Sequence, residues 1–189
     1  MKTRLFFFAA LMTALMAFGA TASAQNCTIT RDAIGPVKLG MSTKALPKSV
    51  DGLYDKIEKI SSYNEMEDYE EVFYKATLKG QDVLFIYEDD GGNVYSIDIY
   101  GKQCKTAKGY SVDTPVSTLF NAGAKAFITN EGYYGLLLND ILFGAMKFSQ
   151  KGMKTYENAY LNGDAKFTAS DFVAGSKSDW IRLNKYNYE

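Results

Sequence analysis

Two segments of this chain follow the same pattern of residues. The first reads IGPVKLGMSTKAL over residues 34–46, and the second reads GYSVDTPVSTL over residues 109–119. Each has a glycine, a short stretch that ends in an aliphatic residue, a turn, and helix-forming residues that close on a leucine. Leu39 and Val112 occupy the same place in the two segments. A pattern written twice in so short a chain predicts two similar units that bury their apolar faces together.

Each unit is expected to begin with a short helix and to continue as antiparallel strands. Ser42 or Thr43 can cap a helical turn in the first unit, and in the second Thr114 precedes Pro115 at the first helical position. Alternating apolar residues then predict four strands in each unit. The predicted strands cover 53–60, 72–78, 82–88 and 93–100 in the first unit, and 125–129, 133–139, 141–148 and 179–186 in the second.

The sequence therefore predicts an α+β fold made of two tandem helix-plus-antiparallel-sheet repeats. The first repeat is expected over residues 25–104 and the second over residues 105–189. A long excursion separates the last two strands of the second unit, with a helical turn expected at 169–174.

The N-terminus has the three parts of a secretory signal peptide. Lys2 and Arg4 precede an apolar run, and Ala22-Ser23-Ala24 supplies a small-x-small cleavage signal. The apolar run is shorter than the roughly 20 residues that a spanning helix needs. We expect residues 1–24 to be removed, which leaves an exported chain, periplasmic or secreted, without a membrane span.

Cys27 and Cys104 are the two cysteines of the chain. In an exported protein an even pair usually forms a disulfide. Each cysteine also lies a few residues ahead of one copy of the repeated segment. The bond would therefore join the starts of the two predicted repeats. In the chain-entropy model a loop of this length is stabilised by about 4–5 kcal/mol. The alternative is a pair of buried free thiols.

The composition of the chain argues against most kinds of catalytic and ligand-binding site. The chain has no histidine, and its net charge is −1 without a basic patch. A histidine-dependent nucleophile, a zinc site and a nucleic-acid partner are therefore not expected. No phosphate-binding or dinucleotide motif occurs. We expect a protein that is not an enzyme and has no cofactor or metal, although hydrolysis by paired carboxylates stays open.

The hairpin over residues 82–100 has two chemically different faces. Period-two alternation assigns one face to the core, with Leu84, Ile86, Tyr95, Ile97 and Ile99. The other face carries Val83, Phe85, Tyr87, Val94, Ser96, Asp98 and Tyr100. This second face has more polar residues than a core, and more aromatic residues than a surface that binds nothing.

Mixed surfaces of tyrosine, serine and aspartate suit the recognition of proteins or glycans. The candidate binding residues are Phe85, Tyr87, Ser96, Asp98 and Tyr100, joined by Tyr133 and Tyr134 from the second unit. The alternative is that a helix or a second sheet covers this face.

The openings GPVKLGM and GYSVDT, together with FTASDF and WIRL near the C-terminus, resemble a class of small exported bacterial proteins. This class has tandem helix-plus-sheet repeats, like the β-lactamase-inhibitor protein fold and the outer-membrane assembly lipoproteins of the SmpA/OmlA type. The resemblance implies an interaction module without catalysis. The chain departs from these proteins because it lacks a lipid-attachment cysteine and has one cysteine pair where the inhibitor has two.

Together these features predict an exported, non-catalytic module that binds a macromolecule, and in first place a protein, through the aromatic sheet face. The alternative is a small-ligand or glycan binder that uses a cleft between the two repeats.

Overall fold

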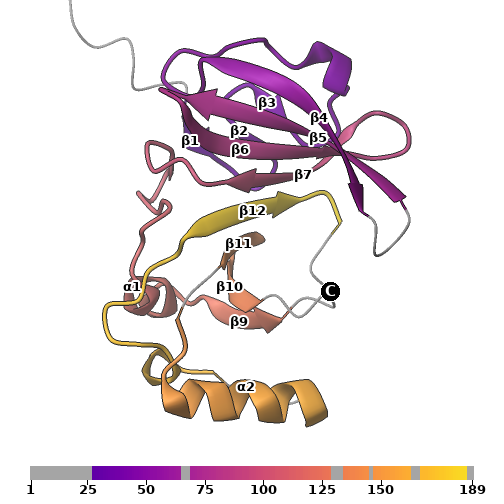
Figure 1. The fold of residues 1–189 in the computed structure, drawn as a ribbon. Helices are drawn as coiled ribbons and strands as arrows, with labels where there is room; N and C mark the ends of the chain where they lie inside the picture. Colours follow the sequence, from indigo (N-terminus) through magenta and orange to yellow (C-terminus); the bar gives the residue numbers. More distant parts are fainter. Residues whose placement is uncertain (1–26, 65–68, 129–133, 145–146, 163–166, 187–189) are drawn as a thin grey trace, which may run out of the picture.

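One long antiparallel sheet organises the molecule (Figure 1). The computed structural model describes residues 27–64, 69–128, 134–144, 147–162 and 167–186, so the predicted signal segment lies outside the described residues. The large sheet has eight strands in the order β4-β5-β6-β7-β12-β11-β10-β9. Its strands are β4 (Lys56–Asn64), β5 (Tyr69–Leu78), β6 (Gln81–Glu88), β7 (Val94–Ile99), β9 (Lys125–Ile128), β10 (Tyr134–Leu138), β11 (Ile141–Gly144) and β12 (Trp180–Asn184).

A second, smaller sheet covers part of one face of the large one. Its four strands have the order β3-β2-β1-β8, and each spans two residues. They are β1 (Thr28–Ile29), β2 (Ala33–Ile34), β3 (Val37–Lys38) and β8 (Lys105–Thr106). β1 and β8 pair in parallel, which brings the start of the described chain against the middle of the sequence.

The helices of the described residues are short. The 3₁₀ helix η1 spans Thr43–Ala45, α1 spans Val116–Asn121, α2 spans Gln150–Asn162 and η2 spans Ala169–Asp171. α1 packs against β10 and η2, while α2 packs against η2 at the end of the molecule farthest from β4 (Figure 1).

The predicted α+β class with tandem helix-plus-sheet repeats is wrong. The described chain is mostly β, with two sheets and two short α-helices. In place of the first predicted helix there is one 3₁₀ turn, because Pro47 lies directly after Leu46 and disfavours a helical backbone there. The strands on both sides of residue 104 also belong to one sheet, since β7 pairs with β12.

The first of the two repeated segments pairs with the first residue of β7 and with the turn before it. The Gly40 N–H donates to the Val94 carbonyl at 2.7 Å, and the Thr43 N–H donates to the Gly92 carbonyl at 2.9 Å. Gly40 has a φ of 79°, a left-handed conformation that glycine adopts without a steric cost.

The second repeated segment makes the same contacts just ahead of β12. The Asp113 N–H donates to the Ser178 carbonyl at 2.8 Å, and the Val116 N–H donates to the Ser176 carbonyl at 2.9 Å. Asp113 stands where the first segment has Gly40, and it has nearly the same φ, 76°. The two segments thus share a way of attaching to the large sheet, while the division of the chain into two repeats stays a prediction.

The core lies between the two sheets and under α1. On β12, Ile181 and Leu183 are fully buried, and they pair with the buried Ile99 and Ile97 of β7. Leu119 of α1 is equally buried. The same core includes Ile29, Ile34, Val37, Leu84, Ile86, Leu136 and Phe143. One face of the large sheet therefore supplies the core.

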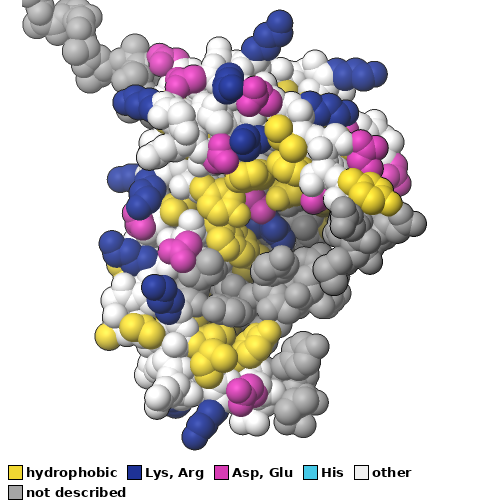
Figure 2. Space-filling model, viewed as in Figure 1, with side chains coloured by type: hydrophobic (Ala, Val, Ile, Leu, Met, Phe, Trp, Pro, Cys, Tyr) yellow, Lys and Arg dark blue, Asp and Glu magenta, His cyan; other side chains and the backbone are white. Residues whose placement is uncertain are grey.

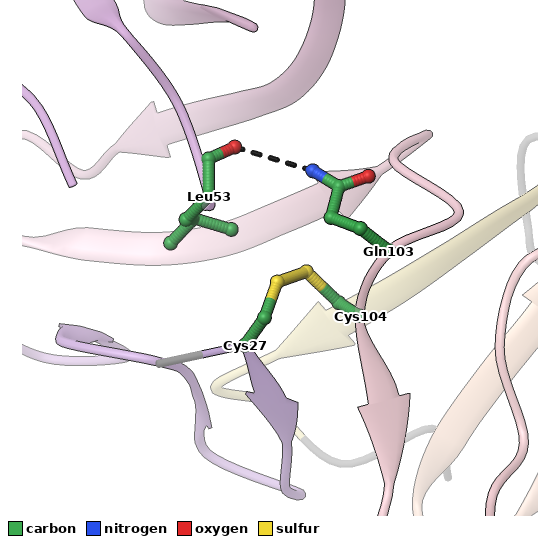
Figure 3. The surroundings of a disulfide bond; sticks show 4 residues. All are labelled: Cys27, Leu53, Gln103 and Cys104. Carbon is green, nitrogen blue, oxygen red and sulfur yellow. Dashed lines mark hydrogen bonds between the residues drawn. A yellow bond between two sulfur atoms is a disulfide. The ribbon is translucent and has the colours of Figure 1, made fainter. Parts of the chain in front are cut away.

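A disulfide joins the two cysteines beside the small sheet (Figure 3). Cys27 and Cys104 form a disulfide with their Cα atoms 4.7 Å apart, within the range that a disulfide spans. The bond lies directly before the parallel pair β1 and β8. Beside it, the Gln103 side-chain amide donates to the Leu53 carbonyl at 3.2 Å. The predicted cysteine pairing is thus present in the structure.

Candidate interaction surface

The face of the large sheet that looks away from the core carries a cluster of aromatic rings. The ring of Phe73 on β5 lies 5.8 Å from that of Phe85 and 5.9 Å from that of Tyr87. Tyr100 lies 5.5 Å from Phe85, and Tyr95 lies 6.3 Å from Tyr87. These five residues are called the aromatic face below. In Figure 2, hydrophobic side chains gather over the region of β5 to β7.

The aromatic face is open to solvent to different degrees. Tyr100 is 40% exposed, whereas Phe85 and Tyr87 are half-buried. Ser96 and Asp98, whose polarity motivated the prediction of an open face, are buried at 4% and 3% exposure. Their burial is tolerated because both have partners on β12.

The partner of Asp98 is Arg182, which lies directly opposite it where β7 pairs with β12. Arg182 donates from Nε to Oδ1 at 2.6 Å and from Nη2 to Oδ2 at 2.8 Å. This two-pronged geometry is the strong form of an ion pair. Next to it, the Ser96 hydroxyl donates to the Leu183 carbonyl at 3.2 Å. Asp98 and Arg182 thus place a paired charge at the edge of the aromatic cluster.

The ring of Trp180 also contacts Arg182. The guanidinium carbon of Arg182 lies 5.3 Å from the centre of the Trp180 ring, within the range of a cation–π contact. The ring of Trp180 lies against its neighbour on β11, Gly144. A Cβ at Gly144 would stand 2.1 Å from the Trp180 ring, so a glycine is required there.

The hydroxyl of Tyr87 lies in a partly buried and charged environment. Burial raises the pKa of Tyr87, and the negative charge of Asp98 raises it further, while Arg182 acts in the opposite direction. The phenol therefore stays protonated over the physiological range and can donate a hydrogen bond.

Two β-bulges change which side chains reach the aromatic face. Alternation assigns Tyr95 to the core and Val94 to the mixed face, but the register shift between Tyr87 and Glu88 reverses these positions. Val94 is fully buried in the core, and Tyr95 contacts Tyr87. An extra residue in one strand of a pair breaks the two-residue alternation locally.

Val83 also belongs to the core, at 5% exposure, and not to the mixed face. It lies at the second register shift, between Ala76 and Thr77 of the neighbouring strand. Alternation alone cannot reveal either bulge.

The structure also adds residues that the sequence did not single out. Phe73, Trp180 and Arg182 belong to this surface with the predicted residues. The alternation in DWIRLN places Trp180 and Arg182 on one face, but their position beside Asp98 depends on the pairing of β7 with β12. Of the two other predicted tyrosines, Tyr133 lies outside the described residues, and Tyr134 begins β10 opposite Ile128.

Neither a membrane-spanning helix nor a metal-binding cluster of side chains occurs within the described residues. Among these residues no helix is long and apolar enough to cross a membrane. Within the same part of the chain, no three Cys, Asp or Glu side chains lie together in a way that would hold a metal ion.

The chain was also compared with known proteins. No family model and no curated protein matches the sequence. Among solved structures, an uncharacterized protein, yfeY from Escherichia coli, is similar with a TM-score of 0.51 and 12% sequence identity. The match covers 84% of this chain and 99% of the other. At this identity the likeness concerns the fold alone.

Proposed function

We propose that the mature chain is an exported, non-catalytic module that binds a protein partner through the aromatic face. The observation that carries this proposal is the Asp98–Arg182 ion pair, buried on the side of the sheet that does not form the core and bordered by aromatic rings.

The chemistry of this surface supports protein recognition. Tyrosine, tryptophan and arginine are the residue types most enriched where binding energy concentrates in protein interfaces. Here Tyr87 and Tyr100 present large rings, while Trp180 and Asp98 hold Arg182 in a fixed orientation. A side chain that is already ordered loses little conformational entropy when a partner binds.

An exported location, periplasmic or secreted, is part of the proposal. It is supported by the signal-like residues 1–24 and by the Cys27–Cys104 bond, since disulfides persist in oxidising compartments. The near-neutral charge of the chain supports a partner other than nucleic acid.

Capture from the native envelope tests the proposal. The mature chain is immobilised in three forms: wild type, the double variant Tyr87→Ala/Tyr100→Ala, and Tyr63→Ala. Tyr63 is a matched control because it is 60% exposed on β4, outside the aromatic face. Proteins enriched by the wild type are quantified by mass spectrometry.

The expected result is a protein that the wild type and Tyr63→Ala capture equally and that the double variant captures at least about tenfold less, as for the loss of an interface hot spot. A circular-dichroism melt confirms that the double variant is folded. If the folded double variant captures the same proteins in the same amounts, the aromatic face is not the binding surface.

A further inference from the structure

A pocket of about 240 Å³ opens at the edge of the core, between the small sheet and the hairpin of β10 and β11. It lies on the core side of the large sheet, so it is separate from the aromatic face. Its lining comes from three parts of the fold: β1, the loop over residues 106–110, and the hairpin over residues 138–143.

The floor of the pocket is apolar. Ile29, Leu138, Ile141 and Phe143 all line it, and each is at most 7% exposed. An apolar cavity of roughly 150 Å³ is already sufficient to bind benzene. The pocket therefore has room for one ring, or a chain of similar size, together with a short polar tail.

The loop that forms one wall is held by its own hydrogen bonds. The Thr106 N–H donates to the Tyr110 carbonyl at 2.8 Å, and the Tyr110 N–H donates to the Thr106 hydroxyl at 3.1 Å. Just before this loop, the disulfide fixes Cys104 to Cys27.

The opposite wall is a tight turn. Asn139 and Asp140 both have positive φ, 52° and 60°, as a two-residue hairpin turn requires. Arg31 reaches Asp140 with its Nε 3.3 Å from Oδ2, which links the turn to the end of β1. Both walls of the pocket are therefore preformed in the absence of a ligand, as is usual for small-molecule sites.

The positive charge of Lys108 at the pocket favours a negatively charged ligand. Lys108 lines the pocket and is exposed, and its ammonium group makes no ion pair with any described residue. We propose that this pocket binds a small carboxylate whose single ring or short chain fills the apolar floor and whose negative end faces Lys108. This site is independent of the protein-binding proposal.

An NMR titration of the ¹⁵N-labelled mature chain, with its disulfide intact, tests this site. The probe is 3-phenylpropanoate, and its neutral analogue 3-phenylpropan-1-ol isolates the contribution of the charge. Ala107→Phe fills the mouth of the pocket from an exposed loop position, and Lys108→Gln removes the cation. Ala174→Phe is the matched control, since Ala174 is an exposed alanine that lines a different concavity.

We expect saturable amide shifts confined to residues 106–110 and 138–143. Ala107→Phe should weaken binding of both probes at least about tenfold, and Ala174→Phe should leave it unchanged. Lys108→Gln should weaken the carboxylate about 2–5-fold and leave the alcohol unaffected, as for an exposed charge pair.

Absence of saturation by about 10 mM carboxylate would overturn the proposal, and so would shifts centred elsewhere or a folded Ala107→Phe variant that binds like the wild type. Equal affinity of the wild type for the two probes would exclude the assigned ligand class.

Discussion

The Asp98–Arg182 pair belongs to the joint between β7 and β12, which unites the two halves of the large sheet. Asp98 is 4% exposed in its side chain and Arg182 21%, so both ions have lost most of their water. The attraction within a buried pair roughly offsets that loss, and the removal of one partner leaves a buried charge uncompensated. This pair is therefore expected to fix the register of β7 against β12 more than to raise stability.

Two variants separate these contributions. Arg182→Ala should lower the free energy of unfolding by about 3–5 kcal/mol, because it leaves the Asp98 carboxylate buried alone. The combined variant Asp98→Leu/Arg182→Met should come within about 1 kcal/mol of the wild type, because it removes both charges and keeps apolar volume. Urea melts measure both values. A combined variant as unstable as Arg182→Ala would contradict this account.

At the residue scale, the sequence predicts the composition of the surface better than its arrangement. Alternation correctly places Phe85, Tyr87 and Tyr100 away from the core. It misplaces Val94 and Tyr95, because a bulge depends on how two strands pair and leaves no local signal. The burial of Asp98 could not be predicted either, since its partner lies on a strand more than eighty residues later in the chain.

At the scale of elements, a polar cluster fastens the first repeated segment to the end of β6. The Thr43 hydroxyl donates to Glu88 Oε2 at 2.8 Å, and Lys59 Nζ lies 3.1 Å from Glu88 Oε1. Tyr74 donates to the same carboxylate at 3.3 Å. The hydrogen bond from Thr43, followed by the contact with Lys59, holds the pKa of Glu88 below its usual value.

This lowered pKa makes a prediction about stability and pH. The unfolded chain binds a proton at Glu88 near the ordinary pKa of 4.5, whereas the folded chain binds it only at lower pH. The stabilisation is therefore complete above about pH 5 and is lost as the pH falls through the folded-state pKa. Glu88→Gln lacks this dependence.

Denaturant melts between pH 3 and pH 7 measure the difference in unfolding free energy between wild type and Glu88→Gln. The wild-type advantage should be constant from pH 7 to about pH 5 and should shrink below about pH 4.5. Thr43→Val should reduce the part that changes with pH. An advantage that is the same at pH 3 and pH 7 would show that Glu88 is not held by this cluster.

The sequence predicts the long strands and α1 better than it predicts α2 and the two-residue strands of the small sheet. The predicted strands at 72–78, 82–88 and 93–100 overlap β5, β6 and β7, because these strands alternate between apolar and polar residues except at the two bulges. The helix α2 was missed, and its sequence contains Gly152, a poor helix former. The structure explains that glycine: a Cβ at this position would stand 1.8 Å from the carbonyl oxygen of Asp171 on η2.

At the scale of the whole molecule, the two faces of the large sheet have different surroundings. One face packs against the small sheet and α1 and forms the core. The other carries the aromatic face and the Asp98–Arg182 pair. In the proposed function, the rings of this second face contact the protein partner.

The fold class illustrates the limit of reading repeats from a sequence. The two similar segments predict two tandem repeats, whereas in the structure they share only a way of attaching to the large sheet, at Gly40 and at Asp113. They do not indicate that the following strands merge into one sheet, because that depends on the pairing of β7 with β12 across the middle of the molecule.

Site-specific photo-crosslinking in the native envelope tests the central claim most directly, since it records which surface a partner touches. A benzophenone amino acid replaces Tyr100 on the aromatic face in one variant and Tyr63 on β4 in another; these positions are 40% and 60% exposed. Irradiation should give a discrete adduct with another protein from position 100 and none from position 63. Adducts from position 63 alone, or none from position 100 in the folded and exported protein, would contradict the account.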